Sequence, residues 1–92
     1  AYYRPGNFTT GFDTWVENKK FDESSTHFSA DLLIDGNNNK TASVVVSMNP
    51  NYKYDVKWNG ENLEYKELAQ GTLSIILPID KRKDGVLEVD KK

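Results

Sequence analysis

The sequence predicts an all-β fold, a small antiparallel β-sandwich of six to seven short strands. Apolar residues recur at every second position in several segments, and turn-forming residues separate these segments at the spacing typical of sandwiches. No long stretch has the apolar spacing of an amphipathic helix. With 92 residues, the chain is expected to form one domain, residues 1–92, around a single modest core. A sandwich is favoured over a small barrel.

The first predicted strand covers residues 12–17. Its side chains alternate between two faces, with Phe12, Thr14 and Val16 on one and Asp13, Trp15 and Glu17 on the other. If Phe12 and Val16 set the inward side, Trp15 points to solvent between the two carboxylates. In the alternative register, Trp15 is buried and its neighbours are exposed. Residues 18–25 are polar and are predicted to form a loop.

The next two predicted strands cover residues 27–35 and 41–48. The first places Phe28 and Leu32 on its apolar face, and the second places Val44 and Val46 there. The intervening residues 35–40 are rich in Asp, Gly and Asn, which tolerate the backbone conformations that a reversal needs. The two strands are therefore predicted to form a hairpin.

The second half of the chain predicts the remaining strands. Residues 52–58 alternate strictly and end at Asn59-Gly60, the strongest short hairpin signal in the sequence, so residues 61–66 are the expected partner strand. Residues 72–79 form a further strand, and Asp84-Gly85 is predicted to be a tight turn before a last strand over residues 86–90. These last two aliphatic strands are expected to be antiparallel neighbours.

Composition and residue counts argue against several function classes. The chain has 12 Lys and Arg against 14 Asp and Glu, without the concentrated basic face that nucleic acids require. No apolar run is long enough to span a membrane. There is no cysteine, and His27 is the single histidine, which argues against thiol chemistry, a Ser-His-Asp triad and an imidazole zinc site. We expect no enzyme activity, no cofactor and no metal.

One segment has a weak similarity to a calcium-binding loop. Asp35, Asn37 and Asn39 offer oxygen ligands at alternate positions, as such loops do. However, Lys40 and Val46 stand where a full loop of that type needs a glycine and a bidentate glutamate. An ordinary Asn-rich turn is therefore preferred.

Aromatic residues make up 12% of the chain and point to a ligand site. Phe12, Phe28 and Trp58 share faces with aliphatic residues and are assigned to the core. The predicted ligand-binding site comprises Trp15, Asp13, Glu17, Tyr2 and Tyr3. We expect Trp15 to stack on a sugar, Asp13 and Glu17 to accept hydroxyl hydrogen bonds, and Tyr2 or Tyr3 to extend the platform.

A family resemblance adds to this interpretation. The segments YDVKWNGENL (residues 54–63), GTLSIILP (71–78) and VLEV (86–89) resemble the accessory β-sandwich domains, immunoglobulin-like or carbohydrate-binding, of secreted bacterial polysaccharide-degrading enzymes. The resemblance covers residues 52–90. It implies an extracellular or cell-surface, non-catalytic module that either binds glycan or braces a neighbouring domain of the same chain.

Two further expectations complete the interpretation. Because the sequence begins at Ala1 without an initiator methionine, it is expected to be a piece of a longer chain. The alternative function is a structural or protein-interaction immunoglobulin-like domain, such as a spacer, adhesin or assembly module.

Overall fold

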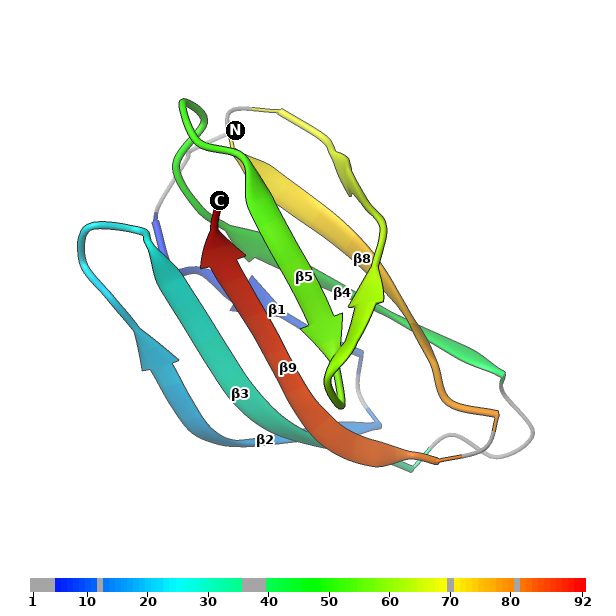
Figure 1. The fold of residues 1–92 in the computed structure, drawn as a ribbon. Helices are drawn as coiled ribbons and strands as arrows, with labels where there is room; N and C mark the ends of the chain where they lie inside the picture. The colour runs from blue at the N-terminus through cyan, green and yellow to red at the C-terminus, as the bar shows by residue number, and fades with distance from the viewer. Residues whose placement is uncertain (1–4, 12, 36–39, 70, 81) are drawn as a thin grey trace.

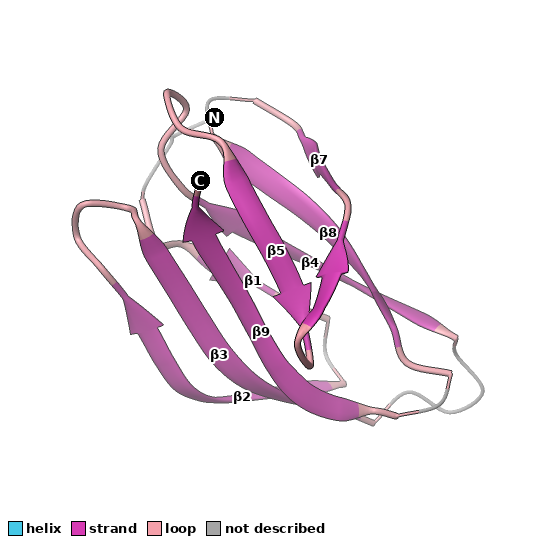
Figure 2. Cartoon of the chain, viewed as in Figure 1, coloured by secondary structure: helices cyan, strands magenta, loops and turns pink. Residues whose placement is uncertain are grey.

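The chain forms two antiparallel sheets packed face to face, which confirms the predicted sandwich (Figures 1 and 2). The computed structural model describes residues 5–11, 13–35, 40–69, 71–80 and 82–92. Nine strands and no helix occur among these residues: β1 (Phe8–Thr9), β2 (Thr14–Phe21), β3 (His27–Ile34), β4 (Thr41–Ser47), β5 (Tyr54–Trp58), β6 (Glu61–Leu63), β7 (Tyr65–Glu67), β8 (Thr72–Pro78) and β9 (Asp84–Lys91). One sheet has the order β1-β4-β8-β7 and the other β2-β3-β9-β5-β6.

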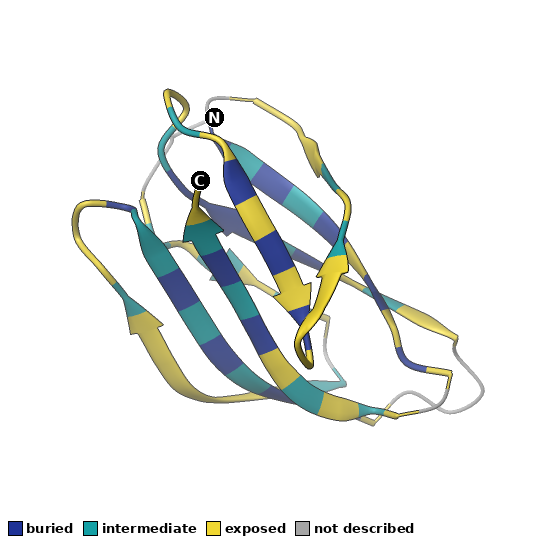
Figure 3. Cartoon of the chain, viewed as in Figure 1, coloured by how far each residue is buried: buried dark blue, intermediate teal, exposed yellow. Residues whose placement is uncertain are grey.

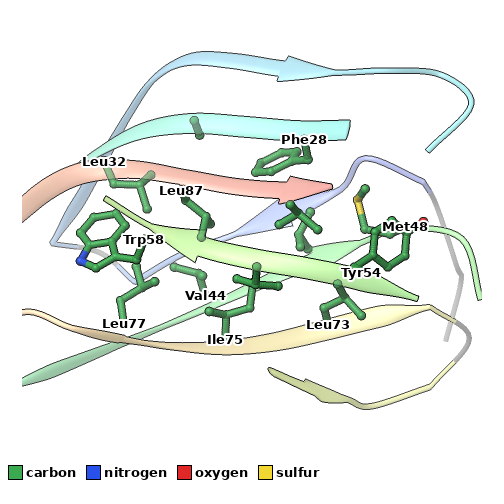
Figure 4. Packing of buried hydrophobic residues seen from close by; sticks show 14 of the residues in the cluster. Phe28, Leu32, Val44, Met48, Tyr54, Trp58, Leu73, Ile75, Leu77 and Leu87 are labelled. Atoms are coloured by element: carbon green, nitrogen blue, oxygen red, sulfur yellow. The ribbon is translucent and has the colours of Figure 1, made fainter. Parts of the chain in front are cut away.

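The core lies between the inner faces of the two sheets (Figure 4). Buried residues alternate with exposed ones along β5 and with half-buried ones in the second half of β9, as their sequences predict (Figure 3). Trp58 is 4% exposed and lies with Leu32 and Leu77 at one end of the core, so its predicted core position is confirmed. Phe28 is also fully buried. Burial of each such large side chain stabilises the fold by about 1.5–3 kcal/mol.

The hairpin predicted at Asn59-Gly60 is confirmed. Val56 pairs with Leu63 and Trp58 with Glu61 across the turn. Asn59 and Gly60 have φ angles of 53° and 83°, which is the left-handed conformation that a tight two-residue hairpin requires at both positions. Asn and Gly adopt it at the lowest cost, which explains the strength of the sequence signal.

The hairpin predicted between residues 27–35 and 41–48 is wrong, because β3 and β4 lie in different sheets. Both segments do form strands, with the predicted faces buried. A period-2 pattern defines the face that a strand buries but not its neighbour, since two apolar faces can pack across the sandwich as well as pair side by side. Residues 36–39, which contain Asn37 and Asn39 of the considered calcium loop, lie outside the described residues.

The expected pairing of the last two aliphatic strands is also wrong. β8 pairs with β4 and β7, whereas β9 pairs with β3 and β5 in the other sheet. The predicted turn at Asp84-Gly85 is instead the start of β9, where Gly85 pairs with Leu32. A Cβ atom on Gly85 would lie 2.1 Å from Asn59 Oδ1, so this glycine permits a close approach within the sheet rather than a reversal.

The structure has more strands than the six to seven predicted, for two local reasons. The single strand expected over residues 61–66 leaves one sheet as β6 and enters the other as β7. The short strand β1 precedes the first predicted one. In addition, β2 continues through the predicted loop to Phe21, with a change of register between Glu17 and Lys20 and a positive φ at Asn18.

Candidate functional site

Trp15 lies on the outer face of the five-stranded sheet, and 65% of its surface is exposed. Its position follows from the pairing of β2 with β3, in which Trp15 lies opposite Leu33 while Val16 lies opposite the buried Leu32. The structure therefore has the register in which Trp15 points to solvent. Val16 is on the inward side but is still exposed, because β2 is the edge strand of its sheet. Phe12 lies outside the described residues.

Two aliphatic side chains from neighbouring strands extend the apolar surface around Trp15. Leu33 on β3 is 52% exposed and Val86 on β9 is 42% exposed. Together with Trp15 they border an open depression of about 500 Å³, here called the Trp15 depression. Its lining comprises Trp15, Glu17, Leu32, Leu33, Arg82, Asp84, Gly85 and Val86.

Three charged side chains border the same depression. Glu17 enters it from β2. Arg82 Nε donates a hydrogen bond to Asp84 Oδ1 at 2.9 Å. This hydrogen bond, and then the Arg82 charge, lower the pKa of Asp84 below its ordinary value of 3.8. Asp84 therefore remains an ionised hydrogen-bond acceptor at neutral pH.

Asp31 lies beside Glu17 on the adjacent strand, and the bulge in β2 changes the environment of this acidic pair. Glu17 and Asp31 are direct cross-strand partners, an arrangement in which like charges repel. Asn18 Nδ2 donates a hydrogen bond to Asp31 Oδ2 at 2.7 Å. Asn18, which has a left-handed backbone, thus provides Asp31 with a hydrogen-bond donor. The other carboxylate of the pair, Glu17, borders the Trp15 depression.

Asp13 borders a different depression from Trp15 and Glu17. It lies before β2 and borders a smaller depression of about 260 Å³, together with Thr14 and Ile34 and with Thr41, Ala42 and Ser43 of the other sheet. Its backbone oxygen accepts a hydrogen bond from Asp35 N at 2.8 Å. The structure thus brings Trp15 and Glu17 together and places Asp13 at a different depression. Tyr2 and Tyr3 lie outside the described residues.

Leu33, Arg82, Asp84 and Val86 were missed as site residues by the sequence interpretation, although two of them carry a signal. Leu33 and Val86 are aliphatic residues at positions of the polar face, next to the inward Leu32 and Leu87. An aliphatic side chain out of phase with its strand indicates an exposed apolar surface. Leu33 and Val86 come together only because β3 and β9 are neighbours in the sheet, and the alternation of apolar residues does not define the sheet order.

A second polar cluster lies elsewhere on the five-stranded sheet. His27 Nδ1 and Asp90 Oδ1 lie within hydrogen-bonding distance of each other between β3 and β9, and both side chains are partly exposed. Asp90 lies opposite Asp55 of β5, whose Oδ1 is 3.8 Å from Lys92 Nζ. Within the described ranges, no three His, Asp or Glu side chains are grouped so that they could hold a metal ion.

No family model, curated protein or solved structure matches this chain. The described residues also contain no helix that is long and apolar enough to cross a membrane.

Proposed function

We propose that the chain is a non-catalytic carbohydrate-binding or accessory module that recognises glycan by stacking a sugar ring on Trp15. The observation that carries the proposal is the exposed indole of Trp15, which shares one depression with Glu17, Arg82 and Asp84. A pyranose ring has an apolar C–H face and a rim of hydroxyl groups. An aromatic face suits the first, and charged donors and acceptors suit the second.

The shape of the site favours shallow recognition. The Trp15 depression is open and lies on the outer face of a sheet, so a ligand there covers one side of the indole. The strands β2, β3 and β9 hold the backbone of the site in a hydrogen-bonded sheet, which limits the conformational entropy lost on binding. An extracellular, bacterial context is part of this proposal, and the resemblance of residues 52–90 to accessory domains supports it.

Binding of soluble polysaccharides and oligosaccharides tests the proposal. We expect Trp15→Ala to weaken binding of the ligands identified in such a screen about tenfold, which corresponds to about 1.4 kcal/mol. Intrinsic fluorescence should respond to the same ligands, since Trp15 is exposed and Trp58 is buried. Ile76→Ala is the matched control, because Ile76 is 53% exposed on the outer face of the other sheet. Failure of every saccharide to bind, or binding that Trp15→Ala leaves unchanged, would exclude this site as a glycan platform.

A second candidate function is protein interaction through the same face. Leu33 and Val86 make the surface beside Trp15 more apolar than a sugar ring alone requires, and contiguous exposed apolar side chains are typical of protein contacts. Sedimentation measurements over a range of concentrations test whether the chain self-associates. Self-association that Leu33→Glu abolishes, combined with no saccharide binding, would favour this alternative.

A further inference from the structure

We infer that the Trp15 depression continues past Arg82 into a second depression, and that the complete groove accommodates an oligosaccharide chain without acidic groups. The inference rests on the proposed function, because it concerns the same ligand and begins at the same indole. It adds the length and the charge of the ligand.

The second depression lies at the same end of the sandwich. It has a volume of about 520 Å³ and is lined by Trp58, Asn59, Glu61, Pro78, Asp80 and Arg82. Arg82 therefore borders both depressions, so the two share a wall. Arg82 binds Asp84 through Nε, which leaves its Nη groups able to donate hydrogen bonds to a ligand that passes over it.

The register of the sheet places the two depressions side by side. Trp15 pairs with Leu33, and Leu33 pairs with Asp84 at the start of β9. Asn59 then connects the end of β5 to β9, because its Oδ1 accepts a hydrogen bond from Val86 N at 3.0 Å. One row of residues thus crosses β2, β3 and β9 and continues through side-chain contacts to Asn59, directly after β5.

The length of this row exceeds one sugar ring. From β2 to β5 there are three inter-strand spacings of about 4.8 Å, or about 14 Å in total. A monosaccharide stacked on Trp15 would leave the second depression empty. A linear oligosaccharide that crosses the strands could contact the indole at one end and Glu61 and Asp80 at the other.

The charges along the groove define the class of oligosaccharide. Among the described residues, the carboxylates of Glu17, Asp84, Glu61 and Asp80 border the two depressions, together with the guanidinium of Arg82. Arg82 already pairs with Asp84. A uronate or sulfated sugar would bring like charges together, whereas neutral and amino sugars donate hydrogen bonds to carboxylates without repulsion.

Calorimetric titration with size-graded oligosaccharides tests both parts of the inference. The neutral and amino-sugar probes are cello-, xylo-, manno- and chito-oligosaccharides from disaccharide to hexasaccharide, and oligogalacturonates of equal lengths are the acidic set. We expect affinity for the best non-acidic series to rise about tenfold from disaccharide to pentasaccharide as the second depression is filled. Oligogalacturonates should bind at least about tenfold more weakly.

Variants at the two ends of the groove separate the extension from the platform. Trp15→Ala should weaken binding of both short and long ligands. A Glu61→Gln, Asp80→Asn double variant should weaken the pentasaccharide about tenfold and leave the disaccharide unchanged. Glu67→Gln is the matched control, because it removes an exposed carboxylate of the other sheet.

Each negative result has a distinct meaning. If affinity depends on Trp15 but not on ligand length, the extension is overturned and the proposed function stands. If oligogalacturonates bind as tightly as neutral oligomers, the charge selection is overturned. If no oligosaccharide binds at all, the proposed function fails and this inference fails with it.

Discussion

The outer faces of the two sheets differ in charge, although their inner faces are both apolar. The central strands β4 and β8 contain no Asp, Glu, Lys or Arg, and their outward positions carry Ser, Thr, Val, Ile and Pro. In the other sheet, β2, β3, β5 and β9 all carry charged residues. Both inner faces are apolar and buried. Core burial therefore does not explain the difference in charge, because both sheets contribute buried apolar side chains to the core.

This contrast has a consequence for ligand recognition. Covering the face of β4 and β8 removes water mainly from hydroxyl and methyl groups, whereas covering the other face removes water from carboxylate and ammonium groups. A ligand on the charged face must replace those hydrogen bonds, which a polyhydroxyl compound can do. The exposed Trp15 lies on this charged face, where its apolar ring is next to the carboxylate acceptors of Glu17 and Asp84.

The largest expected effect separates inner from outer positions on one strand. Ile75 is fully buried and the adjacent Ile76 is 53% exposed, so the pair differs in environment but not in side chain. Ile75→Ala should lower the free energy of unfolding by about 2–5 kcal/mol through lost burial and a residual cavity. Ile76→Ala should change it by less than about 0.5 kcal/mol. Urea unfolding of the two variants measures the difference, and equal losses would contradict the orientation of β8.

A smaller effect is expected at Asn59, which links β5 to β9 on the charged sheet. Asn59→Gly keeps the positive φ but removes the hydrogen bonds to Val86 N and Asp84 O, at a cost of about 1 kcal/mol. Asn59→Ala also forces an alanine into the left-handed region, which adds about 1 kcal/mol. Thermal and urea unfolding should rank the wild type above Asn59→Gly and Asn59→Gly above Asn59→Ala.

The same site offers a converse test. Gly85→Ala places a methyl group against the Asn59 amide, so it should disturb the hydrogen bond to Val86 although Asn59 is unchanged. Amide hydrogen exchange at Val86 measures this directly. If Gly85→Ala leaves that exchange rate at the wild-type value, the close approach of the two strands is not as described.

Some features of this fold could be predicted from the sequence and others could not. Alternation predicted the buried faces of β3, β5 and β8, since the side-chain period of a strand is local. Turn chemistry predicted the hairpin at Asn59, because the left-handed backbone there needs particular residues. The neighbours of β4 and β9 could not be predicted, because any two apolar faces can pack across the sandwich or pair side by side.

The candidate site was only partly predictable for the same reason. Trp15 and Glu17 come from one strand, so their common side follows from period 2. Leu33 and Val86 join them only through the sheet order β2-β3-β9. Asp13 is two residues before Trp15, so strand alternation would put both side chains on one face. Asp13 precedes the first residue of β2, however, and alternation does not hold outside a strand.

The smallest expected effect is a pH dependence confined to the charged side of the molecule. The pKa of Asp84 is lowered by the Arg82 hydrogen bond and charge, and that of Asp22, in the connection between β2 and β3, is lowered first by the Thr26 hydrogen bond. A folded-state pKa below the unfolded value means that the unfolded chain binds more protons in acid. The stability from these groups is therefore present above their ordinary value of 3.8 and is lost as the pH falls through the folded values.

NMR titration of the side-chain carboxyl groups measures this effect at each residue. Arg82→Gln should raise the pKa of Asp84 toward its ordinary value and leave Asp22 unchanged, whereas Thr26→Ala should do the reverse. In the same titration, amide shifts along β4 and β8 should move little, because these strands carry no acidic group. An Asp84 that titrates identically with and without Arg82 would remove the ion pair from the site. The guanidinium would then be available to an acidic ligand, and the preference for non-acidic sugars inferred from the groove would be weaker.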